Sequence, residues 1–236
     1  MLSWRTKTTI QRCAEAFGYK IQRIRSSSNS LDVLEVAVHL LLARHRSPFF
    51  VQIGANDGVS SDPLRNIVLK YHLRGMLVEP NPPVFNKLVD NYRGESQLRF
   101  ENVAVGPTIG TKTIYVPVSQ GIADLFGSFD RNVLIRRFGR STEIREVEVQ
   151  TVPLGLLLER GGNRQLDLVQ IDTEGYDFEI LKMLDFSKWL PALVNYEHIN
   201  LSDSDYRESV ELLISHGYQT CAHGIDTLAV HKSLME

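Results

Sequence analysis

Two segments in the second half of the chain contain residue types that can transfer protons. Asp172 and Glu174 stand in Ile171-Asp172-Thr173-Glu174-Gly175, and Glu197 and His198 follow an apolar run further along. A positioned carboxylate or imidazole can take a proton from a hydroxyl group, which accelerates its attack on an electrophile by about 10²–10⁴-fold. Of these groups, an imidazole has the reference pKa best suited to base catalysis near neutrality. All four side chains are therefore candidate catalytic residues.

Each candidate also has a structural interpretation. His198 can be a strand-end histidine bonded to a carbonyl group, and Glu174 can cap a helix that begins near Gly175, where free amides stabilise a carboxylate. Glu197 can orient His198 or bind substrate hydroxyls. As a further alternative, Asp172, Glu197 and His198 could provide three ligands to a divalent metal ion. Their spacing is not diagnostic of a metal site, so no metal is assigned.

A glycine turn in the first third of the chain has the features of a nucleotide or nucleoside site. The apolar run Phe50-Val51-Gln52-Ile53 leads into Gly54-Ala55-Asn56-Asp57-Gly58. A buried strand that ends in Gly-x-x-x-Gly lets the backbone approach a ligand at the edge where open α/β sheets bind cofactors. The spacing differs from the dinucleotide pattern Gly-x-Gly-x-x-Gly. An acidic Asp57 would repel a pyrophosphate but tolerate a cationic ligand.

A second mark of a nucleoside site is Glu79, which ends the next apolar run. A carboxylate at this strand end can accept hydrogen bonds from both hydroxyl groups of a ribose. The glycine turn and Glu79, in this order, favour a nucleoside site over two unrelated turns. NAD is the chief alternative cofactor, although the missing third glycine and Asp57 argue against it.

The elements needed to position these residues follow from hydrophobic periodicity. Expected strands cover 49–53, 75–79, 98–105, 166–171, 192–197, 218–221 and 227–231, and expected helices cover 62–71, 83–92, 176–184 and 205–216. Continuous apolar strands that alternate with amphipathic helices indicate a parallel sheet covered on both faces. We therefore predict an α/β, Rossmann-like doubly wound fold with a mostly parallel seven-stranded sheet. Its final strand is expected to be antiparallel.

Two segments fall outside this alternation. Residues 1–47 are predicted to form a helical appendage, with helices at 8–24 and 31–44 and Ser30 as an N-cap, which covers the substrate cleft or mediates dimer contact. Within the domain at 48–236, residues 106–150 form an irregular insertion, a hairpin or a lid, with strand-like alternation at 111–116 and 146–151. Its arginines form either a solvated face or a site for an anionic substrate such as a uronate or a phosphate: Arg131, Arg136, Arg137, Arg140 and Arg145.

Composition excludes several classes of protein. The chain has 236 residues, 43% of them hydrophobic and 23% charged, with a net charge of -2, so no nucleic-acid partner is expected. No apolar stretch approaches the roughly 20 residues that span a bilayer, and stable membrane association is not expected, although the basic N-terminal helix could touch a membrane surface. Cys13 and Cys221 fit neither a disulfide framework nor a metal knuckle. We expect a cytoplasmic protein, and homo-oligomerisation stays open.

Four segments, taken in order, resemble the FkbM family of methyltransferases. They are Phe50-Val51-Gln52-Ile53-Gly54-Ala55-Asn56-Asp57-Gly58, Leu77-Val78-Glu79-Pro80-Asn81-Pro82, Asn102-Val103-Ala104-Val105 and Leu168-Val169-Gln170-Ile171-Asp172-Thr173-Glu174-Gly175-Tyr176-Asp177. The similarity runs from about residue 49 to residue 230. It implies a class I methyltransferase that uses S-adenosylmethionine and usually methylates a hydroxyl group.

The resemblance also implies roles for individual residues. The cofactor-binding residues expected from it are Gly54, Ala55, Asn56, Asp57, Gly58, Glu79, Pro80, Asn102, Val103 and Asp172. Glu79 would hold the ribose, and Asn102 with Val103 would border the adenine. Gln52 departs from the broader class I pattern, in which an acidic residue often precedes the turn. This departure shifts the binding of the methionine ammonium group to Asp57 or Asp172.

The predicted function is therefore methyl transfer from S-adenosylmethionine to an oxygen of a small molecule or a glycan. An NAD-dependent oxidoreductase is the alternative among enzymes. A catalytically inactive methyltransferase-like binding module is the alternative from another class, and the candidate residues at 172, 174, 197 and 198 argue against it.

Overall fold

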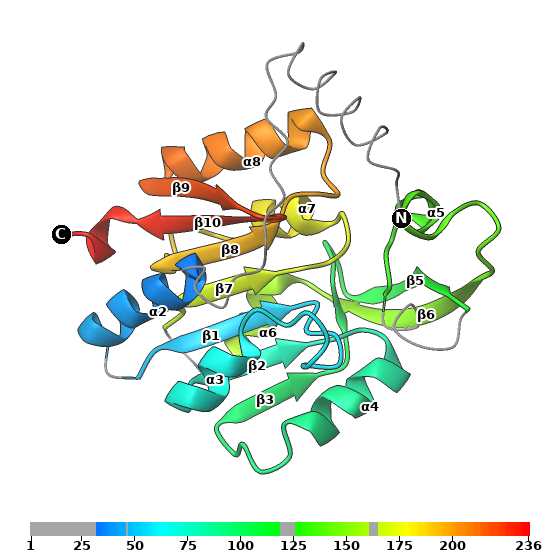
Figure 1. Ribbon diagram of the computed structural model, residues 1–236, viewed down its shortest axis with the longest axis horizontal. Helices are drawn as coiled ribbons and strands as arrows, with labels where there is room; N and C mark the ends of the chain where they lie inside the picture. The colour runs from blue at the N-terminus through cyan, green and yellow to red at the C-terminus, as the bar shows by residue number, and fades with distance from the viewer. Residues whose placement is uncertain (1–31, 46, 119–125, 161–164) are drawn as a thin grey trace, which may run out of the picture. The chain divides into compact units, whose positions relative to one another are not determined.

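The computed structural model describes residues 32–45, 47–118, 126–160 and 165–236, and those from Val33 onward belong to one compact unit that ends at Glu236. Its main sheet has seven strands in the order β3-β2-β1-β7-β8-β10-β9 (Figure 1). They are β1 (Phe49–Ile53), β2 (Arg74–Val78), β3 (Leu98–Glu101), β7 (Leu168–Ile171), β8 (Leu193–Glu197), β9 (Tyr218–His223) and β10 (Asp226–His231). Only β10 pairs antiparallel with its neighbours in this sheet. The predicted Rossmann-like fold and its antiparallel final strand are confirmed.

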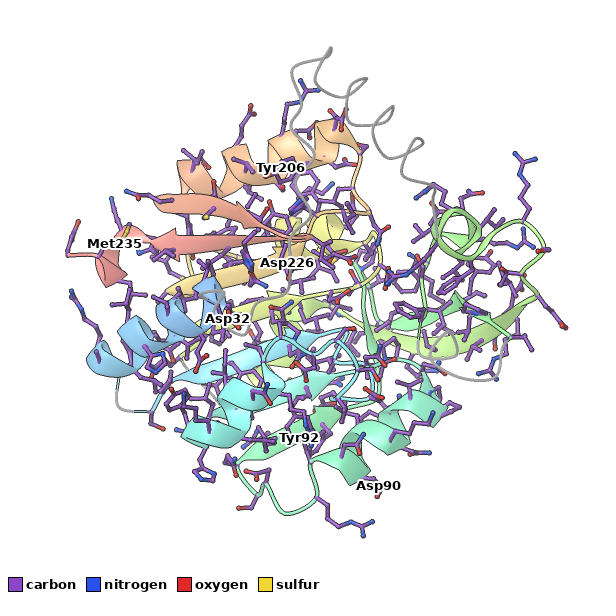
Figure 2. All side chains as sticks on the ribbon, in the orientation of Figure 1. Asp32, Asp90, Tyr92, Tyr206, Asp226 and Met235 are labelled. Atoms are coloured by element: carbon purple, nitrogen blue, oxygen red, sulfur yellow. The ribbon has the colours of Figure 1, made fainter. Side chains whose placement is uncertain are left out.

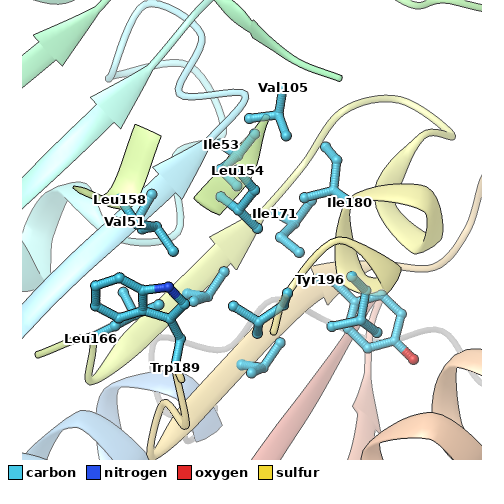
Figure 3. Packing of buried hydrophobic residues seen from close by; sticks show 14 of the residues in the cluster. Val51, Ile53, Val105, Leu154, Leu158, Leu166, Ile171, Ile180, Trp189 and Tyr196 are labelled. Carbon is cyan, nitrogen blue, oxygen red and sulfur yellow. The ribbon is translucent and has the colours of Figure 1, made fainter. Parts of the chain in front are cut away.

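The central strands are buried along their whole length, which explains why their sequences are continuously apolar. Alternate side chains enter two separate cores: Phe50 packs on one face of β1 and Val51 on the other. Figure 3 shows part of the second core, where Val51 and Ile171 pack near Trp189. Burial of each such side chain contributes roughly 1.5–3 kcal/mol.

Helices cover both faces of the main sheet. One core receives side chains from α2 (Val33–Arg44), α3 (Arg65–Tyr71) and α4 (Pro82–Asn91). The other receives them from α6 (Leu154–Arg160), α7 (Asp177–Lys182) and α8 (Asp203–Ser215). The sequence did not predict α6, because its short, Gly-containing run Leu-Gly-Leu-Leu-Leu-Glu-Arg has no clear helical period.

Helix α2 packs on the main sheet rather than apart from it. Leu34, Val38 and Leu41 are buried in the same core as Leu193 of β8 and Leu228 of β10. The predicted helix at 8–24 and the expected cap Ser30 lie outside the described residues. The role and boundary of the predicted appendage therefore stay predictions.

The prediction of one strand over 98–105 was wrong, because this segment contributes to two sheets. After β3, the chain bends and β4 (Ala104–Val105) joins a second sheet of order β4-β6-β5. At the bend, the side-chain amide of Asn102 donates to the carbonyl oxygens of Glu79 and Pro80, at 2.8 and 3.1 Å. These side-chain bonds hold the bend at Asn102, so that β3 does not continue into β4 as one strand.

The second sheet contains the predicted inserted hairpin. Strands β5 (Gly110–Pro117) and β6 (Ile144–Val152) pair antiparallel, and α5 (Arg131–Phe138) lies between them in sequence. In Figure 1 the insertion lies on the right, beyond the carboxyl ends of the parallel strands.

No helix within the described ranges is long and apolar enough to cross a membrane. The expected cytoplasmic location stays a prediction, and the oligomeric state stays open.

Candidate active site

A cavity lies at the carboxyl ends of the central parallel strands. This is the edge at which open α/β sheets bind ligands. The insertion contributes Phe126, Phe129 and Arg137 to its wall. The predicted site residues that line it are Gly54, Ala55, Asn56, Glu79, Pro80, Val103, Asp172, Glu174 and Glu197, whereas Asp57, Gly58, Asn102 and His198 lie outside this lining.

The glycine turn after β1 uses its own backbone amides internally. The amides of Gly54 and Ala55 both donate to the carbonyl oxygen of Val78, at 2.9 and 3.0 Å. The next five amides also have partners within the chain, namely those of Asn56, Asp57, Gly58, Val59 and Ser60. A pyrophosphate cradle needs amides that point at the ligand, so this turn does not suit a dinucleotide.

The two glycines of the turn are required for different reasons. Gly54 has φ +80°, and a Cβ atom there would lie 1.7 Å from the carbonyl oxygen of Asp172, so β1 and β7 approach too closely for any side chain. Gly58 has φ +69°, and its Cβ atom would meet Leu88 and Tyr92 at 2.6 and 2.5 Å. Gly54 thus shapes the cavity, whereas Gly58 packs the turn against α4 and its C-terminal end.

Asp57 stabilises the turn and does not face the cavity. Its Oδ1 accepts the amides of Val59 and Ser60 at 2.9 and 2.7 Å, and its Oδ2 accepts the Ser60 hydroxyl at 2.9 Å. Of the two carboxylates considered for a ligand ammonium group, the geometry favours Asp172, which lines the cavity.

Gln52 binds a carboxylate of the same wall, that of Asp62, which the sequence analysis did not identify as a site residue. Its Nε2 donates to Oδ1 of Asp62 at 3.1 Å, and both side chains line the cavity. Asp62 also accepts the amide of Leu64 at 2.8 Å and the hydroxyl of Tyr92 at 3.1 Å. Its Oδ1 also accepts the amide of Arg65 at 3.2 Å. Residues 62–64 therefore form a turn held by Asp62, and α3 starts at Arg65 rather than at residue 62.

Glu79 is a buried carboxylate held by two backbone amides. Its Oε2 accepts the amide of Asn56 at 3.1 Å and its Oε1 that of Asn81 at 2.8 Å. Burial raises the pKa of Glu79 to about 7, against the effect of these two bonds. Since Glu79 lines the cavity, a ligand hydroxyl can reach it without any rearrangement of the turn.

Three carboxylates meet at the ends of β7 and β8. Oxygen atoms of Asp172, Glu174 and Glu197 all lie within 4.8 Å of one another. Burial, followed by the charge of Glu197, raises the pKa of Asp172 well above its usual value. Burial is also the main cause that raises the pKa of Glu174 and of Glu197 to about 7. The cavity wall therefore holds groups that can exchange protons near neutral pH.

The turn that presents Glu174 is fixed by a residue with no predicted role. Glu174 and Gly175 have φ +53° and +101°, and Asp177 accepts the amides of Thr173 and Gly175, each at 3.1 Å. Asp177 is fully buried, and burial raises its pKa to about 7. Asp177, the first residue of α7, thus holds the turn that precedes the helix, and the Glu174 side chain lines the cavity.

Two donors from distant segments join the acidic cluster. Nη1 of Arg137 lies 2.9 Å from both carboxylate oxygens of Glu174. The side-chain amide of Asn200 donates to Glu174 and to Glu197, each at 2.8 Å. A divalent cation would have to displace these donors, and His198 is not part of the cluster. The arrangement therefore suits hydrogen-bonding ligands better than a metal ion.

His198 lies beside the site but outside its lining. Its Nδ1 is 3.0 Å from the hydroxyl oxygen of Thr227, and its ring packs on Tyr206, with centroids 4.8 Å apart. Figure 2 labels Tyr206 on α8 and Asp226, which lines the cavity at the start of β10. These contacts give His198 a structural role, with the hydroxyl group of Thr227 in place of the expected carbonyl group.

Aromatic rings form another part of the wall. Phe126, Phe129 and Tyr176 line the cavity. Lys112 lies 3.8 Å from the Phe129 ring centroid and 4.5 Å from that of Tyr176. No spacing in the sequence connects these residues, since the insertion contributes some and the β7–α7 turn contributes Tyr176.

Comparisons with known proteins agree with this architecture. The Methyltransferase FkbM domain model matches residues 52–220. A solved methyltransferase FkbM from Methylobacillus flagellatus KT is 14% identical, with a TM-score of 0.51 over 78% of this chain; the match spans only 44% of that chain. An O-methyltransferase from Bacillus cereus, solved with SAH, is 11% identical over 98% of this chain and 92% of that one, with a TM-score of 0.45. No curated protein matches the sequence.

These findings make S-adenosylmethionine the cofactor, and the cavity fits it. Glu79 offers acceptor oxygens for the ribose, and Val103 lines the cavity beside it. Asp172 and Asp62 line the same cavity; burial raises the pKa of each, and a ligand with a sulfonium and an ammonium group would favour their ionised forms.

Proposed function

Because the chain belongs to the FkbM methyltransferase family, we propose that it methylates an oxygen atom of a hydroxyl-bearing small molecule or glycan. One observation carries this proposal: carboxylates with a pKa near 7 and aromatic rings line the same cavity as the cofactor-binding residues. Carboxylates accept hydrogen bonds from hydroxyl groups, and aromatic faces can pack against the C–H faces of a sugar ring.

When bound, S-adenosylmethionine supplies a sulfonium methyl group that passes to the acceptor oxygen as the carbon–sulfur bond breaks with its electron pair kept on sulfur. The protein has two tasks in this reaction. Its cavity must align the acceptor with the methyl group, for which well-oriented systems gain roughly 7–11 kcal/mol. One of its carboxylates must also take the hydroxyl proton, because a neutral hydroxyl is a weak nucleophile.

The charge of the cavity wall favours a neutral acceptor. Of the insertion's clustered arginines, only Arg137 lines the cavity, and its guanidinium is paired with Glu174. The carboxyl groups that line the cavity are Asp62, Glu79, Asp172, Glu174, Glu197 and Asp226. A uronate or phosphate acceptor would face this excess of acidic groups, so we propose a neutral polyol or glycan hydroxyl as the acceptor.

Two other functions fit the geometry less well. The internally bonded amides of the glycine turn disfavour the pyrophosphate of NAD. A binding module without activity has no need for several buried carboxylates with raised pKa values, which cost stability at neutral pH.

The test is a transfer assay with methyl-labelled S-adenosylmethionine against neutral glycans and polyols, uronates, sugar phosphates and amines. We expect label on an oxygen of a neutral acceptor, located by mass spectrometry and NMR, with slower transfer to anionic acceptors. Label found only on nitrogen, or a clear preference for anions, would contradict the proposal. Cofactor binding without any transfer would favour the inactive module.

A further inference from the structure

We propose that Glu197 is the general base of this cavity, and that Arg137, which binds the neighbouring Glu174, is a positioning residue whose charge favours the ionised form of Glu197. This inference rests on the proposed transfer to a hydroxyl group. It assigns different tasks to two carboxylates that the sequence cannot distinguish.

Hydrogen bonds separate the roles of Glu174 and Glu197. Both oxygens of Glu174 accept from Arg137, and one of them also accepts from Asn200. In the part of the chain that the structure describes, the Glu197 side chain has one hydrogen-bond donor, Asn200, which reaches Oε2. The other oxygen, Oε1, is therefore available to a hydroxyl group in the cavity. To accept a proton from that hydroxyl group, Glu174 would have to give up a bond to Arg137.

The charged groups around Glu197 come from each element packed against it. Acidic neighbours are Asp172 and Glu174 in the turn after β7, Asp177 on α7 and Asp226 on β10. Burial and these like charges favour the protonated form of Glu197. Arg137 on α5 is the cation that opposes them, and it lowers the pKa of Glu197 by its charge.

His198 follows Glu197 in sequence, but the two side chains do not act together as a catalytic base. The His198 ring lies against the hydroxyl group of Thr227 and packs on Tyr206. Burial raises the pKa of Asp226, and the charge of His198 opposes that effect. The proton released by the acceptor hydroxyl thus goes to Glu197, which becomes a carboxylic acid. It returns to solvent after the product leaves, so no other reactant is needed.

Arg137 lies where its side chain can be substituted without disturbing the main sheet. Its side chain is 38% exposed, belongs to the insertion, and lies with its guanidinium carbon 4.0 Å from the ring centroid of Phe126. The neighbouring Arg136 is also exposed, but it does not line the cavity. The two arginines therefore form a matched pair for substitution, with the same charge on the same helix.

The first test measures activity and cofactor affinity together. Glu197→Gln is expected to lower kcat at least 100-fold and to change the calorimetric Kd for S-adenosylmethionine less than threefold. Glu174→Gln leaves the Glu197 carboxylate in place and is expected to retain more activity than Glu197→Gln. The assignment of the base is overturned if Glu174→Gln is the more damaging variant or if Glu197→Gln stays within tenfold of the wild type.

The second test addresses the positioning role. In Arg137→Met, the acidic limb of the kcat/KM profile should move to higher pH by about one unit, because a cation that favours the ionised carboxylate is lost. Arg137→Lys should restore most of the shift, and Arg136→Met should leave the profile unchanged. Equal shifts in Arg136→Met and Arg137→Met would show a general charge effect and overturn the positioning role.

A third measurement needs no turnover and so separates this inference from the proposed function. Glutamate labelled with ¹³C at the side-chain carboxyl group allows NMR titration of the ligand-free protein, with Glu197→Gln and Glu174→Gln giving the assignments. The Glu197 signal should titrate near pH 7 and shift upward in Arg137→Met. If it titrates at an ordinary glutamate pKa, the inference fails even where methyl transfer is observed. If the shift occurs but no hydroxyl is methylated, the proposed function fails instead.

Discussion

The cofactor half and the acceptor half of the cavity are built in different ways. On the cofactor side, backbone amides connect two neighbouring strand ends: the amide of Gly54 donates to the carbonyl oxygen of Val78, and that of Asn56 to the Glu79 carboxylate. On the acceptor side, Glu174 and Glu197 are connected through long side chains, those of Arg137 and Asn200. The first half is fixed by the backbone, whereas the second depends on side chains that can move or be exchanged.

This contrast suits a protein with an invariant donor and a particular acceptor. A turn whose amides are satisfied internally offers one rigid shape, which is useful for a cofactor that never changes. An acidic wall closed by an inserted hairpin can be altered by substitutions in the insertion alone, without disturbing the sheet. Substitutions in the two halves should therefore differ in what they damage.

The largest effect is expected at Gly54. In Gly54→Ala, the new Cβ atom would lie 1.7 Å from a backbone oxygen of Asp172, at a φ of +80°. Because backbone rather than a flexible side chain is in the way, the free energy of unfolding should fall by about 3 kcal/mol or more, measured by urea denaturation.

Gly94 provides the matched control for this substitution. It has φ +100°, but a Cβ atom there would meet nothing within 4 Å. Gly94→Ala should therefore cost only the backbone strain, about 1–2 kcal/mol. Equal losses in the two variants would mean that strain alone, and not the close approach of β1 to β7, explains the glycine at position 54.

The next largest effect is expected at Glu79, on cofactor affinity. Glu79→Ala removes the carboxylate offered to the ribose and leaves the amides of Asn56 and Asn81 without their acceptor. The Kd for S-adenosylmethionine should rise more than tenfold in calorimetry. Glu148→Ala, at an exposed position of β6 outside the cavity lining, is the control. An unchanged Kd in Glu79→Ala would remove this residue from the ribose site.

The same contrast explains how much the sequence could predict. The strands of the sheet and the cofactor wall are marked by local signals: apolar runs, a glycine turn and a strand-end glutamate. These signals placed Gly54, Glu79 and Asp172 correctly on the cavity. Asp57 and Asn102 were assigned to the ligand, but their side chains are used to hold turns, a distinction that depends on where each side chain points.

The partners of Glu174 and Glu197 could not be predicted, although the two carboxylates were. Arg137 on α5 reaches Glu174 from a distant part of the chain, and Asn200 joins two strand ends. The bend between β3 and β4 also has no hydrophobic signal, since apolar residues occur on both sides of it and Val103 lies within it. Sequence patterns report which face of an element is buried, not which distant side chain meets it.

The smallest predicted effect concerns the stability of the ligand-free protein at different pH values. Burial raises the pKa of Glu79 from 4.5, and that of Asp177 from 3.8, to about 7 in the folded chain. The folded state therefore keeps protons that the unfolded state has already released. The resulting stabilisation is complete below about pH 4 and is lost as the pH rises through 7.

The free energy of unfolding should accordingly fall by about 2 kcal/mol or more between pH 5 and pH 8. Asp177→Asn should reduce this slope, and Glu179→Gln, at an exposed position on the same helix, should leave it unchanged. S-adenosylmethionine should also flatten the slope, because its positive groups stabilise the ionised carboxylates of the cavity. If the cofactor leaves the slope unaltered, its positive groups lie too far from these carboxylates to stabilise their ionised forms.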